Sequence, residues 1–130
     1  MKTRELSEWL ICVASLLIFA GGILHSFVGW PELHETLTQA GANEQLVGAI
    51  GVGWNFGGTA MAILGVLGVA SFLQLRRSYS VAWVYPFIIG GFYTAFGISA
   101  YVQRSRNPHF LAFIFVGVLL TITALLRRRE

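Results

Sequence analysis

The longest uncharged stretch of the chain covers residues 45–75 and reads QLVGAIGVGWNFGGTAMAILGVLGVASFLQL. Its 31 residues include no Lys, Arg, Asp or Glu. About 20 consecutive apolar residues are enough to cross the hydrocarbon core of a bilayer. The stretch therefore predicts a transmembrane helix, and its many glycines predict close contact with neighbouring helices.

Three further uncharged runs flank this stretch, at residues 9–31, 78–103 and 107–126. Charged residues make up only 12% of the 130-residue chain, compared with about 25% in soluble domains. The sequence predicts an all-α fold, a bundle of four transmembrane helices in a single integral membrane domain, residues 1–130. The expected spans are residues 9–29, 47–72, 81–102 and 109–126.

The first loop is the only connection long enough to contain structure of its own. Pro31 suits the first turn of a helix, and Gly41 suits its end. Between them Leu33, Leu37 and Ala40 recur at helical spacing. This pattern predicts a short amphipathic helix lying on the outer membrane surface. Beyond the loop, Asn43 is expected to cap the second span, and Asn107 the fourth.

The distribution of basic residues predicts the orientation of the spans. Seven of the nine fall in the N-terminal segment, the second loop and the C-terminal tail, which share one side of a four-span protein: Lys2, Arg4, Arg76, Arg77, Arg127, Arg128 and Arg129. The opposite side holds only Arg104 and Arg106. The positive-inside rule then places both termini in the cytoplasm. We expect the chain to be integral to the plasma (inner) membrane. These arginines are read as a topology signal, so no nucleic-acid partner is expected.

Small and polar residues indicate which helix faces pack. In the first span, Gly21 and Gly29 lie on the same face as His25, which turns the imidazole toward the bundle. The second span has two neighbouring stripes that are expected to face protein: Gly53, Gly57, Met61 and Gly65, and Gly51, Asn55 and Thr59. This is more than one neighbour needs. We therefore expect membrane lipids and other transmembrane helices as partners, in a homo-oligomer or a larger complex.

A weak internal repeat is visible in the two spans that run outward. Gly21-Gly22 is followed by Phe27, and Gly90-Gly91 is followed at the same distance by Phe96. A duplication would make each half of the chain one helical hairpin.

Several polar residues share the outer half of the predicted spans. They form the candidate ligand-binding site: His25, Trp54, Asn55, Tyr101 and His109. An ionisable residue inside a span is a functional candidate, so His25 is the centre of this outward-facing pocket. The alternative is structural, with a neutral imidazole and the Asn55 amide making hydrogen bonds that tie helices together.

Other chemistry finds little support in the residue pattern. No catalytic constellation is visible, and the spacing of Glu32, His34 and Glu35 matches no metal-ligand pattern. The absence of charged residues within the spans argues against a proton-coupled pump. A haem or chlorophyll ligand at His25 would be chemically sound but would rest on a single residue, so the cofactor stays open.

The whole chain resembles a group of short bacterial four-helix membrane proteins that are broadly DoxX-like. The resemblance rests on Gly22-x-x-His25-x-x-x-Gly29, a polar spot led by Trp54, and Arg104-x-Arg106-Asn107-Pro108-His109 before the fourth span. Members often have Trp-His in the second span, whereas this chain has Trp54-Asn55. The resemblance implies the four-helix fold and does not imply a paired-histidine site.

Two functions are compatible with these features. The first is a non-enzymatic integral membrane protein, either an accessory or packing subunit of a membrane complex or a binder of a lipophilic ligand. The alternative is a membrane-embedded enzyme or redox-linked protein that acts on a lipophilic substrate around His25. The missing catalytic constellation favours the first.

Overall fold

A computed structural model describes residues 3–77 and 79–128, and all of its regular structure is helical. The elements are α1 (Thr3–Leu24), the π-helix η1 (His25–Gly29), α2 (Trp30–Gln39), α3 (Glu44–Arg76), the 3-10 helix η2 (Ser80–Trp83), α4 (Val84–Gln103), the 3-10 helix η3 (Pro108–Phe110) and α5 (Leu111–Arg128). Four helical segments are long and apolar enough to cross a membrane. The prediction of an all-α chain with four such helices is confirmed.

Side-chain caps begin two of these helices where the sequence predicted them. The Asn43 side-chain oxygen accepts a hydrogen bond from the Leu46 N–H at 2.8 Å. Asn107 accepts one in the same way from the His109 N–H at 2.9 Å. Gly41 adopts a φ of +75° after α2, a left-handed conformation that glycine reaches without strain.

The helix predicted in the first loop forms as α2, but no loop separates it from the first span. The backbone stays helical from α1 through η1 into α2. Pro31 lacks the N–H that an α-helix would direct to the carbonyl of Phe27. The wide turn of η1 ends two residues before Pro31, and the helix continues past the missing hydrogen bond. Location of α2 on the membrane surface stays a prediction.

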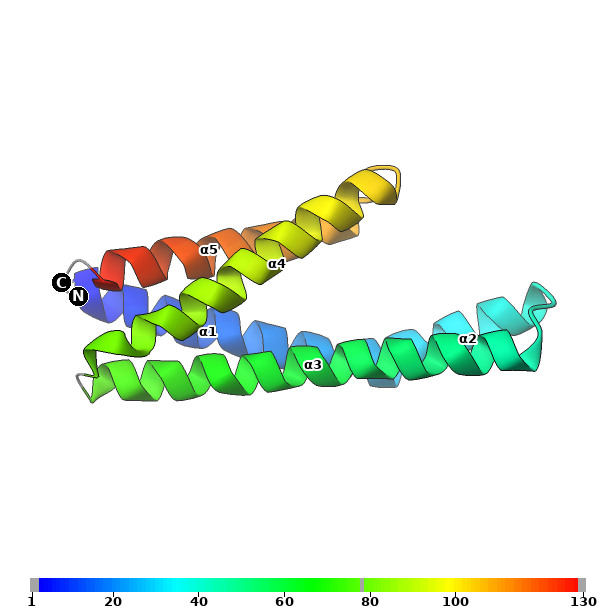
Figure 1. Cartoon of the computed structure of the whole chain (residues 1–130), viewed down its shortest axis with the longest axis horizontal. Helices are drawn as coiled ribbons and strands as arrows, with labels where there is room; N and C mark the ends of the chain where they lie inside the picture. Colours follow the sequence, from blue (N-terminus) through cyan, green and yellow to red (C-terminus); the bar gives the residue numbers. More distant parts are fainter. Residues whose placement is uncertain (1–2, 78, 129–130) are drawn as a thin grey trace. The chain divides into compact units, whose positions relative to one another are not determined.

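The chain divides into two compact units, and α1 and α3 contribute to both. The hairpin unit is Leu16–Val66. The four-helix unit consists of Met1–Ser15 together with Leu67–Glu130. Figure 1 shows α4 and α5, in green-yellow and orange-red, side by side within the four-helix unit.

In the hairpin unit the segments of α1 and α3 pack most closely where their glycines meet. A Cβ added to Gly22 would lie 2.5 Å from the carbonyl oxygen of Gly58. A Cβ added to Gly58 would lie 2.8 Å from the carbonyl oxygen of Gly22 and would also clash with the Ser26 hydroxyl. Farther along, a Cβ on Gly65 would lie 2.6 Å from the backbone of Phe19. Only glycine permits such close backbone approach.

The four-helix unit contains a core to which all its helices contribute. Its fully buried side chains include Ile11 of α1, Leu75 of α3, Pro86 of α4 and Leu120 of α5. The Ser71 hydroxyl donates a hydrogen bond to the Ala82 carbonyl at 2.6 Å and so ties α3 to η2. This convergence of four helices agrees with the predicted bundle.

Within this unit, α4 and α5 cross at a second pair of glycines. A Cβ on Gly90 would lie 2.7 Å from the Gly117 carbonyl oxygen, and the reverse distance is also 2.7 Å. Thr94 follows Gly90 by one helical turn, as Ser26 follows Gly22. The two hairpins therefore share one packing device. By its contacts Gly90 corresponds to Gly22, whereas the predicted repeat aligned it with Gly21, one residue earlier. The duplication itself stays a prediction.

One predicted packing face is only partly covered within the chain itself. Gly53 is exposed, and a Cβ added there would meet nothing within 4 Å in the described part of the chain. Gly57, Met61 and Gly65 do face the first helix of the hairpin unit. One neighbouring helix covers only part of the circumference of α3. Gly53 and Gly57 therefore need not pack against the same helix, although both are small.

Candidate functional site

His25 and Trp54 lie face to face in the hairpin unit. Their ring centroids are 4.1 Å apart and their planes differ by 8°. The indole Nε1 of Trp54 donates a hydrogen bond to the backbone oxygen of His25 at 2.6 Å. A side chain that enters the hydrogen-bond ladder of a helix is a common cause of an irregular turn. This bond is made at the first residue of the π-helix η1.

Glycines make room for this stacked pair. A Cβ on Gly29 would lie 3.2 Å from the Trp54 ring, so the indole rests against bare backbone. A Cβ on Gly57 would lie 3.6 Å from Nε2 of His25. The structure thus brings together two of the five predicted site residues, between a glycine of η1 and a glycine of α3.

Asn55 lies next to Trp54 on α3, but its amide bonds within its own helix. Nδ2 of Asn55 donates to the Gly51 carbonyl at 2.9 Å. Gly51 is itself buried, because the Trp30 ring covers it at 2.6 Å from an added Cβ. The amide therefore stabilises α3 locally.

The other two predicted site residues belong to the four-helix unit. Tyr101 is half-buried in the last turn of α4, and its carbonyl accepts a hydrogen bond from the Arg106 N–H at 2.9 Å. His109 is exposed in η3, with its ring centroid 5.9 Å from that of Phe113. A common pocket that includes these residues and His25 stays a prediction.

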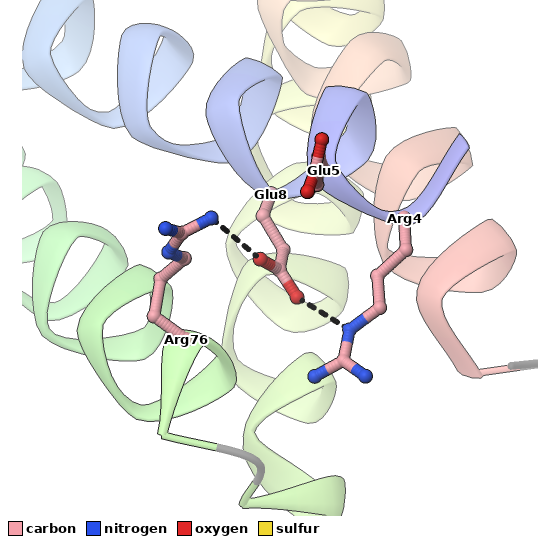
Figure 2. Close-up of a pocket in the computed structure, with 4 residues that line it drawn as sticks. All are labelled: Arg4, Glu5, Glu8 and Arg76. Carbon is pink, nitrogen blue, oxygen red and sulfur yellow. Dashed lines mark hydrogen bonds and ion pairs between the residues drawn. The ribbon is translucent and has the colours of Figure 1, made fainter. Parts of the chain in front are cut away.

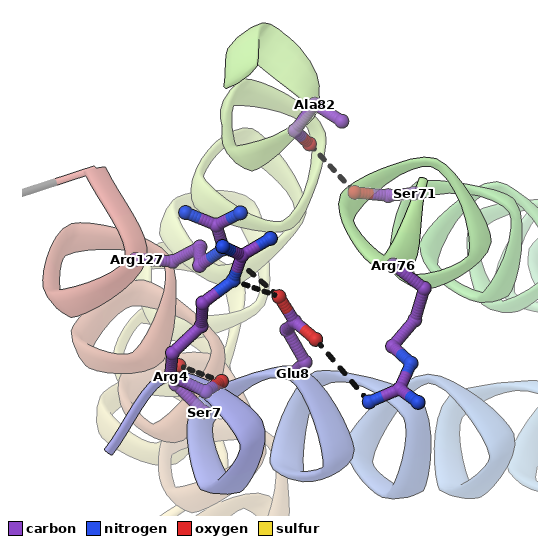
Figure 3. Close-up of polar contacts among 7 residues, drawn as sticks. All are labelled: Arg4, Ser7, Glu8, Ser71, Arg76, Ala82 and Arg127. Carbon is purple, nitrogen blue, oxygen red and sulfur yellow. Dashed lines mark hydrogen bonds and ion pairs between the residues drawn. The ribbon is translucent and has the colours of Figure 1, made fainter. Parts of the chain in front are cut away.

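A second polar site was missed by sequence reasoning. Glu8 of α1 has a side chain that is only 3% exposed, and three arginines surround it (Figure 3). Its Oε1 accepts hydrogen bonds from Nε of Arg4 and Nε of Arg127, each at 3.1 Å. Its Oε2 lies 3.7 Å from a terminal nitrogen of Arg76. We call these four residues the Glu8 cluster.

The Glu8 cluster gathers residues that are far apart in the sequence. Arg127 is 119 positions from Glu8 and is itself buried, with a side chain 8% exposed. Charge counting treated these arginines as a topology signal and did not consider Glu8. One signal was available, because Arg4 and Glu8 are one helical turn apart and of opposite charge.

Neither site gathers the donors of a metal centre. Among the residues that the structure describes, no group of three His, Cys, Asp or Glu side chains lies close enough to hold an ion.

The chain was compared with known proteins at three levels. No protein-family model matches it, and neither a curated protein nor a solved structure does. The function must therefore be argued from the two sites and the exposed surface.

Proposed function

We propose that this chain is a non-enzymatic integral membrane protein that packs against further transmembrane helices, as an accessory subunit of a membrane complex or of a homo-oligomer. The observation that carries the proposal is Gly53, which is exposed in the middle of α3. A glycine inside a helix costs roughly 0.5–1 kcal/mol relative to alanine. At Gly22 and Gly90 close helix crossings offset this cost, whereas nothing in the described part of the chain lies within 4 Å of a Cβ added to Gly53.

The surface around Gly53 has the pattern of large and small residues that is typical of a helix–helix interface. Val52 and Phe56 flank it, and each is 74% exposed. Ala49 and Thr59 continue the same exposed face at helical spacing. Large residues around a small one suit a neighbouring helix that inserts a side chain over the glycine.

The proposal is tested by counting subunits in lipid nanodiscs formed directly from native membranes. We expect a stoichiometric assembly for the wild type. Gly53→Ile should disrupt it, because the added side chain holds the neighbouring helix away. Gly91→Ile is the matched control, since Gly91 is also exposed with nothing within 4 Å of an added Cβ but lies on α4. A monomeric wild type, or equal behaviour of both variants, would contradict the proposal.

The same preparations address the alternative of an enzyme or redox-linked protein. His25→Gln retains a hydrogen-bond donor and acceptor but cannot replace imidazole as an acid-base group or strong ligand. Under our proposal this variant keeps its assembly and its bound lipids. Loss of a coloured cofactor would favour the alternative, whereas loss of a colourless lipophilic molecule alone would favour a non-enzymatic ligand binder.

For location, we propose the plasma (inner) membrane with both termini in the cytoplasm, and a DoxX-like relationship remains compatible with this. The basic residues divide seven to two between the two sides. The Glu8 cluster supports this division, since Arg4, Arg76 and Arg127 come from the three segments that the charge count assigns to the cytoplasm.

Cysteine labelling of intact cells tests this orientation. In a Cys12→Ala background, an impermeant maleimide should modify Thr38→Cys and should spare Tyr79→Cys until the membrane is permeabilised. Both positions are exposed. If only Tyr79→Cys were labelled in intact cells, the orientation would be the opposite of the one proposed.

A further inference from the structure

A pocket of about 250 Å³ opens beside the Glu8 cluster in the four-helix unit. Arg4, Glu5 and Glu8 of α1 line it together with Arg76 of α3 (Figure 2). A water molecule occupies about 30 Å³ in the liquid, so the pocket has room for a group much larger than a single water. Its walls are built from charged side chains and their aliphatic stems, which favours a ligand with an ionic group.

The arginines of this pocket retain hydrogen-bonding capacity for a ligand. Arg4 and Arg127 both direct Nε at one oxygen of Glu8, and neither of these hydrogen bonds uses a terminal guanidinium nitrogen. The side chains of Arg4 and Arg76 are 44% and 47% exposed. Guanidinium groups bind phosphate through pairs of N–H groups, and a lysine cannot reproduce that geometry.

Positive charge is in excess at this end of the four-helix unit. Five arginines described there face only two glutamates: Arg4, Arg76, Arg77, Arg127 and Arg128 against Glu5 and Glu8. Glu8 fixes the positions of the arginines but neutralises only one of them. The remaining field attracts an anion.

An aromatic surface lies next to the arginines. The ring of Trp9, the residue after Glu8, has its centroid 5.1 Å from that of Phe72, one turn deeper in α3 than Arg76. Trp9 is still 48% exposed. Tryptophan prefers the level of lipid headgroups, and basic pockets between transmembrane helices bind anionic headgroups.

We propose that the pocket formed by Arg4 and Arg76 binds the phosphate group of an anionic phospholipid, with Glu8 as the positioning residue that holds the arginines in place. The apolar part of the lipid lies along the neighbouring helix surface at Trp9. The proposal goes beyond the packing function and does not depend on it.

The test is a titration of the full chain in detergent with phosphatidylglycerol, followed by native mass spectrometry. Arg76→Gln should weaken binding about tenfold, because a charge-assisted hydrogen bond to phosphate is lost. Arg77→Gln is the matched control, since it removes the same charge from the adjacent exposed residue, which does not line the pocket. Arg76→Lys should also bind phosphatidylglycerol more weakly than the wild type does. If the lipid were held only by diffuse surface attraction, this variant would bind as tightly as the wild type, because the charge is kept.

Equal losses for Arg76→Gln and Arg77→Gln would overturn the proposal, as would equal affinity of the wild type for phosphatidylcholine. Inorganic phosphate at constant ionic strength is the second probe. If it binds alone with the same dependence on Arg76, the ligand is free phosphate and the assignment to a lipid is wrong. Melting temperatures measured in lipid-free detergent check that each variant is folded. We expect all of them to fold, because Arg127 still pairs with Glu8 in each.

Discussion

Glu8→Ala should lower the free energy of unfolding in detergent by about 3 to 5 kcal/mol, the usual effect of removing one partner of a buried ion pair. The reason lies in Arg127, whose side chain is 8% exposed and hydrogen-bonds to Glu8. Without the carboxylate, this guanidinium is buried with no counter-charge and is repelled by Arg4 and Arg76. Chemical unfolding followed by circular dichroism measures the loss.

Glu5→Ala is the control for this prediction. Glu5 lies in the same turn of α1 as Glu8 but is exposed. Its removal should therefore change the free energy of unfolding by no more than about 0.5 kcal/mol. Replacing the buried pair together, in Glu8→Ala with Arg127→Leu, should recover much of the loss because no buried charge remains unpaired. Equal effects of the Glu5 and Glu8 variants would show that the cluster is not a buried ion pair.

Gly90→Ala should destabilise the α4–α5 crossing by about 1 to 3 kcal/mol, the usual cost of overpacking. The new methyl group would lie 2.7 Å from the Gly117 carbonyl oxygen and 2.7 Å from the Thr121 backbone nitrogen. These are backbone atoms, so the helices must separate to accommodate it. Thermal unfolding in detergent is the measurement.

The adjacent residue provides the control for Gly90. Gly91 is exposed, and a Cβ added there would meet nothing within 4 Å in the described part of the chain. Gly91→Ala should therefore raise stability by up to about 1 kcal/mol, because alanine is the better helix former. The same substitution thus has opposite signs at neighbouring positions. A gain at both would mean that the crossing is looser than the contacts indicate.

The helices themselves could be predicted from the sequence because charge-free runs and caps are local features. Asn43 and Asn107 needed only a neighbouring N–H to act as predicted. The ends were less accurate, since α3 extends from Glu44 to Arg76 instead of residues 47–72. Polar residues can continue a helix beyond its apolar run, so hydropathy marks the apolar span and not the helix.

Partners across helices could not be predicted in the same way. Spacing placed Gly53 and Gly57 on one face, but only the structure shows that Gly57 adjoins His25 and that Gly53 is uncovered. Sequence spacing could not pair Glu8 with Arg127, because the two residues are 119 positions apart in the chain. Among the site residues, His25 and Trp54 meet because glycines allow it, and this depends on the crossing of two helices.

The lengths of the helices have a consequence for the membrane. At about 1.5 Å per residue, the 33 residues of α3 extend about 50 Å and the 20 residues of α4 about 30 Å. A hydrocarbon core of about 30 Å matches α4 and is much shorter than α3. Hydrophobic mismatch costs a fraction of a kcal/mol per Å. If the chain spans a bilayer as we propose, a thicker bilayer would reduce the mismatch of α3 and increase that of α4, so bilayer thickness would act on the two helices in opposite directions.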